Sequence, residues 1–164
     1  MHATSSTVQD LRETQAWDDA AALLGQQGMS CSEAVFVALN ARLRLGMDPS
    51  LAIRAAGGFA GGMALTGGPC GAVSGGVMAL GLALGSDQAG DRLARERMFM
   101  AVQELAELFS AEHGSLLCKE LCPGVKFGDP ESAAKLRQSG RPELLIRTAA
   151  RLVREIVREY EADG

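Results

Sequence analysis

The sequence predicts an all-α protein, a single-domain bundle of six or seven helices around a buried central helix rich in Gly and Ala. No segment alternates apolar and polar residues, and no Asn-Gly turn joins two apolar runs, as is typical of β-hairpins. Apolar residues instead recur at the three- and four-residue spacing of helices. Aromatic residues make up only 4% of the chain, so Ala, Leu, Val and Met must form a closely packed core. The 164 residues suffice for one domain, 1–164, in which we expect 1–7 to be a disordered tail.

Helix-start signals define the elements of the first third of the chain. A Ser-x-x-Glu capping box beginning at Ser30 places Cys31 in the first turn of a helix, which Gly46 stops. An Asp-Pro pair ending at Pro49 opens the next helix. The helices predicted here span about 8–26, 31–45 and 49–56.

A glycine-rich stretch precedes the predicted central helix. The loop 57–68 contains several Gly-Gly pairs, and the helix runs from Pro69 to about Gly85. Residues 55–86 carry no charge, which raises the question of a membrane span. The glycines break the first half of this segment, and the remaining helix is short for a span. The pattern therefore favours a buried helix of a bundle, without membrane insertion.

The second half of the chain continues the helical pattern. Either Asp87 or Asp91 caps a long amphipathic helix that Gly114 ends. A short segment then carries Cys118 and Cys122, and Pro123-Gly124 closes it. The remaining helices start at an Asp-Pro pair and at a proline, and they span about 129–138 and 142–160.

Composition and charge argue against some classes of function. The net charge is −4 and the pI about 5.2, which argues against nucleic acid as a partner because phosphate binding needs a basic surface. The N-terminal residues show no signal peptide, and four cysteines are too few for a secreted disulfide scaffold. We therefore expect a cytoplasmic protein with reduced or cofactor-bound thiols.

The cysteines are the candidate catalytic residues and the candidate metal ligands. Cys31 and Cys70 are predicted in the first turns of their helices, where free N–H groups and the helix dipole favour a thiolate. Cys118 and Cys122 stand four residues apart, so a helix would place both on one face, where they could share a metal or form a disulfide. The alternative is that they are ordinary buried cysteines.

Glycines around the second cysteine are the candidate cofactor-binding residues, because each costs about 1 kcal/mol inside a helix and so needs a compensating close contact. A bound group or a neighbouring helix could provide that contact. The loop before them could cradle a phosphate, bring backbone close to Cys70, or be purely structural. The candidates are Gly68, Gly71 and Gly75.

The segment PCGAVSGG around Cys70, with Cys31 in SCSEAV and Cys118 in HGSLLCKEL, resembles a family of bacterial proteins named C_GCAxxG_C_C for its cysteines. The resemblance covers about 20–157 and implies redox activity; some relatives resemble domains attached to electron-transfer haem proteins with an iron centre. The family's fourth cysteine precedes the proline that opens the last helix. Here Arg141 stands at that place, and Cys122 is the remaining candidate for the fourth role.

Three functions remain open at this point. The first is a redox-active cysteine protein, possible oxidoreductase, that uses its clustered thiols for electron transfer or thiol–disulfide exchange with an unknown redox partner protein. The second is a metal-binding module in which the four cysteines hold an iron–sulfur cluster ([2Fe–2S]) or, with less support, zinc. The third is a non-redox scaffold that forms a homodimer through its small-residue helix.

Overall fold

The computed structural model describes residues 17–162, and these residues form eight α-helices, one short 3-10 helix and no β-strand. The predicted all-α bundle is confirmed, and the four-residue α7 brings the six or seven expected helices to eight. The predicted start of the first helix and the predicted tail lie outside the described residues. The elements are α2 (Trp17–Gln26), α3 (Cys31–Arg42), α4 (Pro49–Ala56), η1 (Gly57–Phe59), α5 (Gly71–Leu84), α6 (Arg92–His113), α7 (Cys118–Leu121), α8 (Pro130–Gln138) and α9 (Arg141–Ala162).

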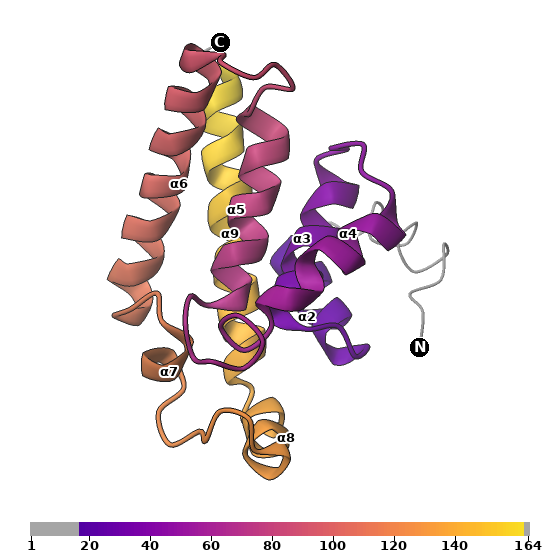
Figure 1. Ribbon diagram of the computed structural model, residues 1–164, viewed down its shortest axis with the longest axis vertical. Helices are drawn as coiled ribbons and strands as arrows, with labels where there is room; N and C mark the ends of the chain where they lie inside the picture. The colour runs from indigo at the N-terminus through magenta and orange to yellow at the C-terminus, as the bar shows by residue number, and fades with distance from the viewer. Residues whose placement is uncertain (1–16, 163–164) are drawn as a thin grey trace.

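The helices form two packed groups. The long helices α5, α6 and α9 run side by side, while α2 and α3 pack against them on one side and α4 packs on α3 (Figure 1). Helix α8 lies beyond the end of the long group, beside the start of α9 (Figure 1). Because α5 contacts α3, α6 and α9, it is the central helix that the sequence predicts. None of the helices in the described part of the chain is long and apolar enough to cross a membrane.

Two consecutive glycines of α5, which face different neighbouring helices, allow this packing. A Cβ atom on Gly75 would lie 2.6 Å from the carbonyl oxygen of Ser32, so the backbone of α3 already occupies that space. A Cβ atom on Gly76 would lie 2.9 Å from Val153 Cγ2 in α9. The helix therefore tolerates its poor glycine propensity because two neighbouring helices approach it closely.

Local capping explains most helix starts. The Ser30 hydroxyl accepts a hydrogen bond from the Glu33 N–H, and the Glu33 carboxylate accepts one from the Ser30 N–H, which completes the predicted capping box. Asp91, rather than Asp87, caps α6. Helix α5 begins at Gly71, two residues later than the Pro69 signal suggests, so that Cys70 is its N-cap instead of its second residue.

The glycine-rich loop is tightly turned. Five consecutive residues from Gly61 to Leu65 have φ between 50° and 73°, which is the left-handed region. Three of them are not glycine, although L-residues rarely adopt this conformation. Hydrogen bonds hold the turn: the Gly68 N–H and the Thr66 hydroxyl both donate to the Gly62 carbonyl, at 3.0 and 2.6 Å.

Candidate functional site

A short antiparallel backbone bridge between Pro69 and Leu117 places two of the cysteines side by side. The Cys70 N–H donates to the Leu116 carbonyl at 2.7 Å, and the Cys118 N–H donates to the Gly68 carbonyl at 2.7 Å. The N-cap of α5 and the first residue of α7 are thereby fixed next to each other. The left-handed turn comes just before this bridge, and the N–H groups of Gly67 and Gly68 donate to the carbonyls of Gly61 and Gly62 in that turn.

Cys31 reaches the same place through close packing of α3 against the start of α5. It is the first residue of α3, directly after the capping box. A Cβ atom on Gly71 would lie 3.4 Å from Cys31 Cβ and 3.0 Å from the Phe59 carbonyl oxygen. The missing side chain at Gly71 therefore leaves room for the Cys31 side chain beside the first turn of α5.

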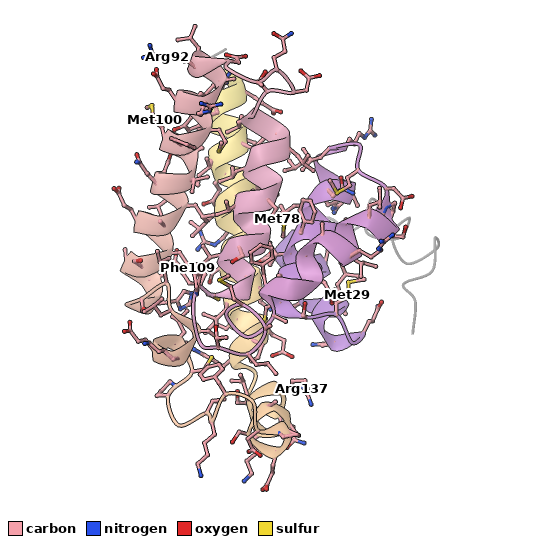
Figure 2. The ribbon with its side chains drawn as sticks, in the orientation of Figure 1. Met29, Met78, Arg92, Met100, Phe109 and Arg137 are labelled. Carbon is pink, nitrogen blue, oxygen red and sulfur yellow. The ribbon has the colours of Figure 1, made fainter. Side chains whose placement is uncertain are left out.

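All four cysteines line one cavity of about 400 Å³, which is hereafter the cysteine cavity. Cys70, Cys118 and Cys122 are buried, Cys31 is half-buried, and all four are free thiols. Figure 2 labels two other lining residues, Met29 beside α2 and α3 and Arg137 on α8, which come from different parts of the molecule. The fold thus gathers in one place the four cysteines that the sequence singles out.

Of the three candidate glycines, one lines the cysteine cavity and two contact neighbouring backbone. Gly71 lines the cysteine cavity. Gly68 serves the backbone bridge through its carbonyl, and Gly75 faces the backbone of α3. Gly68 and Gly75 thus contact neighbouring backbone in the described structure, and their contact with a cofactor stays a prediction.

Burial raises the pKa of the two cysteines at helix starts. For Cys31 the pKa rises to about 12, mainly through loss of water and secondarily through the nearby Cys70 and Cys122. The pKa of Cys70 is also raised by burial, although the N–H groups of Val73 and Ala72 oppose the shift. The predicted activation of these two thiols is therefore wrong, because desolvation outweighs the helix-start N–H groups.

The second cysteine pair behaves differently. Cys118 begins α7 and Cys122 is its C-cap, and the Cys122 N–H donates to the Cys118 carbonyl at 2.9 Å. The Cys118 thiol donates a hydrogen bond to the Cys122 sulfur, which lowers the pKa of Cys122 to about 7 and raises that of Cys118. The charge of Arg141 lowers the pKa of Cys122 further. The pair therefore releases one of its two thiol protons near neutral pH and keeps the other.

Arg141 is a site residue that the sequence analysis noted only as the place of a missing cysteine. Its Nε donates to the Leu121 carbonyl at 3.0 Å, which joins the start of α9 to the end of α7. Arg141 and Cys122 together line a second, more open cleft of about 550 Å³. The available signal was a cation at the first residue of a helix, where the dipole favours an acidic side chain.

Glu143 is a second residue that sequence reasoning missed. It lines the cysteine cavity, and its Oε2 atom is buried without a hydrogen-bond partner. Its charge contributes to the raised pKa of Cys31. An acidic residue in the first turn of α9 looks like an ordinary helix-start residue, so no local signal reveals its place in the cavity.

The placement of the cysteines differs from that of a metal centre. An iron–sulfur cluster or a structural zinc requires four ligand atoms gathered around one point. Within residues 17–162, no group of three or more His, Cys, Asp or Glu side chains is placed to hold a metal ion. The four cysteines share a cavity, but their sulfurs do not form a ligand set in this conformation.

The fold and site together define a small helical thiol protein whose cysteines surround one cavity. A family model with the description "Putative redox-active protein (C_GCAxxG_C_C)" matches residues 29–156. The chain therefore belongs to this family, as the resemblance around Cys70 predicts, and the family description ascribes a redox role to its members. Comparisons with curated proteins and with solved structures gave no match.

Proposed function

We propose that the protein is a thiol–disulfide oxidoreductase in which Cys122 is the attacking thiol and Cys118 the resolving thiol. The observation that carries this proposal is the hydrogen-bonded pair with one lowered pKa, that of Cys122. A thiol with a pKa near the ambient pH combines a large thiolate fraction with good nucleophilicity. The redox description of the family supports the same class of reaction.

The exchange proceeds in two balanced steps. The Cys122 thiolate attacks one sulfur of a substrate disulfide, so that a mixed disulfide forms and the other substrate sulfur leaves as a thiolate. Cys118 then loses its proton and attacks the Cys122 sulfur, which releases the second substrate thiol and closes the Cys118–Cys122 disulfide. Two electrons pass from the protein to the substrate, and the reverse sequence oxidises a dithiol.

The hydrogen bond between the two sulfurs also orders these steps. While Cys122 is a thiolate, the Cys118 thiol donates to it and keeps its own proton. In the mixed disulfide the negative charge on Cys122 is gone, and with it the main cause of the raised pKa of Cys118. The resolving thiol therefore becomes easier to deprotonate after the first step.

The second candidate function is a metal-binding module, which requires the cysteine side chains to rearrange around the metal. The observation that favours it is that all four cysteines line one cavity. Visible absorption of protein purified without air distinguishes the two functions. Charge-transfer bands together with bound iron would support the cluster, whereas a colourless protein with four titratable thiols would support the dithiol mechanism.

Mapping of the first disulfide tests the proposed exchange. Reduced protein is treated with limiting 2-hydroxyethyl disulfide, quenched with acid and analysed by peptide mass spectrometry. We expect the Cys118–Cys122 disulfide to form first, and Cys118→Ser to stop the reaction at a mixed disulfide on Cys122. Cys31→Ser serves as the matched control and should still close the pair. First oxidation between Cys31 and Cys70 would overturn the proposal.

The remaining expectations from the sequence stay predictions. A cytoplasmic location would keep the resting pair reduced, as the proposed direction of exchange requires. The protein partner of the reaction and the homodimer likewise stay open to experiment.

A further inference from the structure

The open cleft beside Cys122 lies between α7, α8 and the start of α9. Its volume of about 550 Å³ is within the range of small-molecule sites. Cys122 and Leu136 line both this cleft and the cysteine cavity, so Cys122 stands in the wall between them. A molecule bound in the cleft therefore lies beside Cys122 without entering the cysteine cavity.

Two cationic side chains and one carboxylate line the cleft, together with two hydroxyl side chains. Arg141 and Lys135 carry the positive charges, and Glu120 carries the negative charge, which accepts a hydrogen bond from Ser115. Ser132 and Ser139 are the hydroxyl residues, and both line the cleft.

The positive charge of Lys135 remains available to a ligand. Its Nζ pairs with Glu131 at 2.8 Å, but both side chains are about three-quarters exposed, at 74% and 77%. Ion pairs this exposed are weak and screened by water and salt. Leu121 and Val125 add apolar surface to the same cleft, so its lining combines apolar walls with cationic side chains.

We propose that this cleft binds low-molecular-weight disulfides that carry carboxylate groups and presents them to Cys122. The proposal rests on the proposed function, since it names the substrate class of the same thiol. Arg141 lies on the α9 side of the cleft and Lys135 on the α8 side, so a dianionic disulfide can contact both while one sulfur faces Cys122. Cys122 then attacks that sulfur, and the other half of the molecule leaves as a thiolate.

Three disulfides of different charge test the proposal on the Cys118→Ser protein, in which only the first exchange occurs. The probes are oxidised glutathione (anionic), 2-hydroxyethyl disulfide (neutral) and cystamine (cationic). Rates of mixed-disulfide formation on Cys122 are measured by mass spectrometry and divided by the rate of each probe with a free cysteine peptide. We expect the anionic probe to react fastest on this scale, with an advantage that shrinks as ionic strength rises.

Reversing the charge of one cleft residue tests whether the preference for the anionic probe arises in the cleft. Lys135→Glu should lower the ratio of anionic to cationic rates roughly tenfold and leave the neutral probe unchanged. Lys126→Glu is the matched control, because it makes the same charge change at an exposed residue outside the cleft lining. Equal effects of the two variants, or no anionic preference, would overturn the proposal. Failure of all three probes to modify Cys122 would instead contradict the proposed function.

Discussion

At the residue scale, Cys122 owes its reactivity to two neighbours that act in the same direction. The Cys118 thiol donates a hydrogen bond to its sulfur, and the Arg141 guanidinium adds a positive charge. Cys31 and Cys70 have N–H groups of helix starts instead, but loss of water on burial outweighs these and raises both pKa values. The pKa of a thiol is therefore decided by what surrounds it in the fold as much as by its position on a helix.

The pH dependence of alkylation follows from this difference. Because only the thiolate reacts, the iodoacetamide rate at Cys122 should rise with pH through about 7 and level off above it. Arg141→Gln should raise the pKa of Cys122 and slow alkylation at pH 7 roughly fivefold, while Lys126→Gln should not. The measurement is peptide-resolved alkylation, and faster labelling of Cys31 or Cys70 than of Cys122 would contradict the assignment.

Individual residues also show which parts of the candidate site could be predicted from the sequence and which could not. The four cysteines could be singled out from their spacing and their helix-start positions. Arg141 and Glu143 could not be assigned to the site, because α9 reaches the cysteines only through the packing of the whole bundle. Desolvation of Cys70 is likewise a property of the folded environment, so the sequence could not show that burial raises its pKa.

At the element scale, the two faces of α5 make a direct test of close packing. Gly75→Ala places a methyl group 2.6 Å from a carbonyl oxygen of α3, so we expect a loss of about 1–3 kcal/mol in the free energy of unfolding. Gly81→Ala in the same helix meets no atom within 4 Å and should stabilise by up to about 1 kcal/mol. Urea unfolding of the two variants measures both changes, and equal shifts would show that contact with α3 is unimportant.

Helix boundaries were largely predictable because their causes are local. The capping residues Ser30, Asp48 and Asp129 each accept backbone hydrogen bonds in the folded protein, as their positions in the sequence suggest. The bridge between Pro69 and Leu117 had no such signal, since it joins segments that meet only in three dimensions. The left-handed turn was also hidden, because Met63 and Leu65 have no preference for positive φ.

At the scale of the whole molecule, the starts of several helices meet at the cysteine cavity. The first residues of α3, α5 and α7 line it, and Pro142 and Glu143 add the first turn of α9. This end lies where the two helix groups and α8 come together (Figure 1). The site therefore depends on the assembly of the bundle and cannot be assigned to one segment.

Buried thiols predict a loss of stability in alkali. The pKa values of Cys31, Cys70 and Cys118 are raised in the folded protein, so the unfolded chain releases these protons first as the pH rises above about 8.5. Stability should then fall by up to about 1.4 kcal/mol per pH unit for each such thiol. Cys122 acts oppositely: because its pKa is lowered in the folded protein, its contribution to stability grows as the pH rises from about 7 to 8.5 and stays constant above that.

Urea unfolding at pH 8, 9 and 10 under reducing conditions measures this dependence. Cys31→Ser should lose stability less steeply between pH 9 and 10 than the unmodified protein, because one of the three thiols is absent. Parallel pH profiles for the two proteins would show that Cys31 is not shielded from water in solution.

The positive φ angles of the turn from Gly61 to Leu65 determine which chirality of amino acid suits it. Its five residues all have positive φ, a backbone conformation that D-amino acids adopt more readily than L-amino acids. Ala64, with φ of 50°, is exposed and has a side chain of one methyl group. A chemically synthesised chain with D-alanine at this position would relieve the backbone while keeping every atom type. In this short segment next to the cysteines, L-amino acids disfavour the backbone conformation that the fold requires. Hydrogen bonds of the turn compensate for that cost.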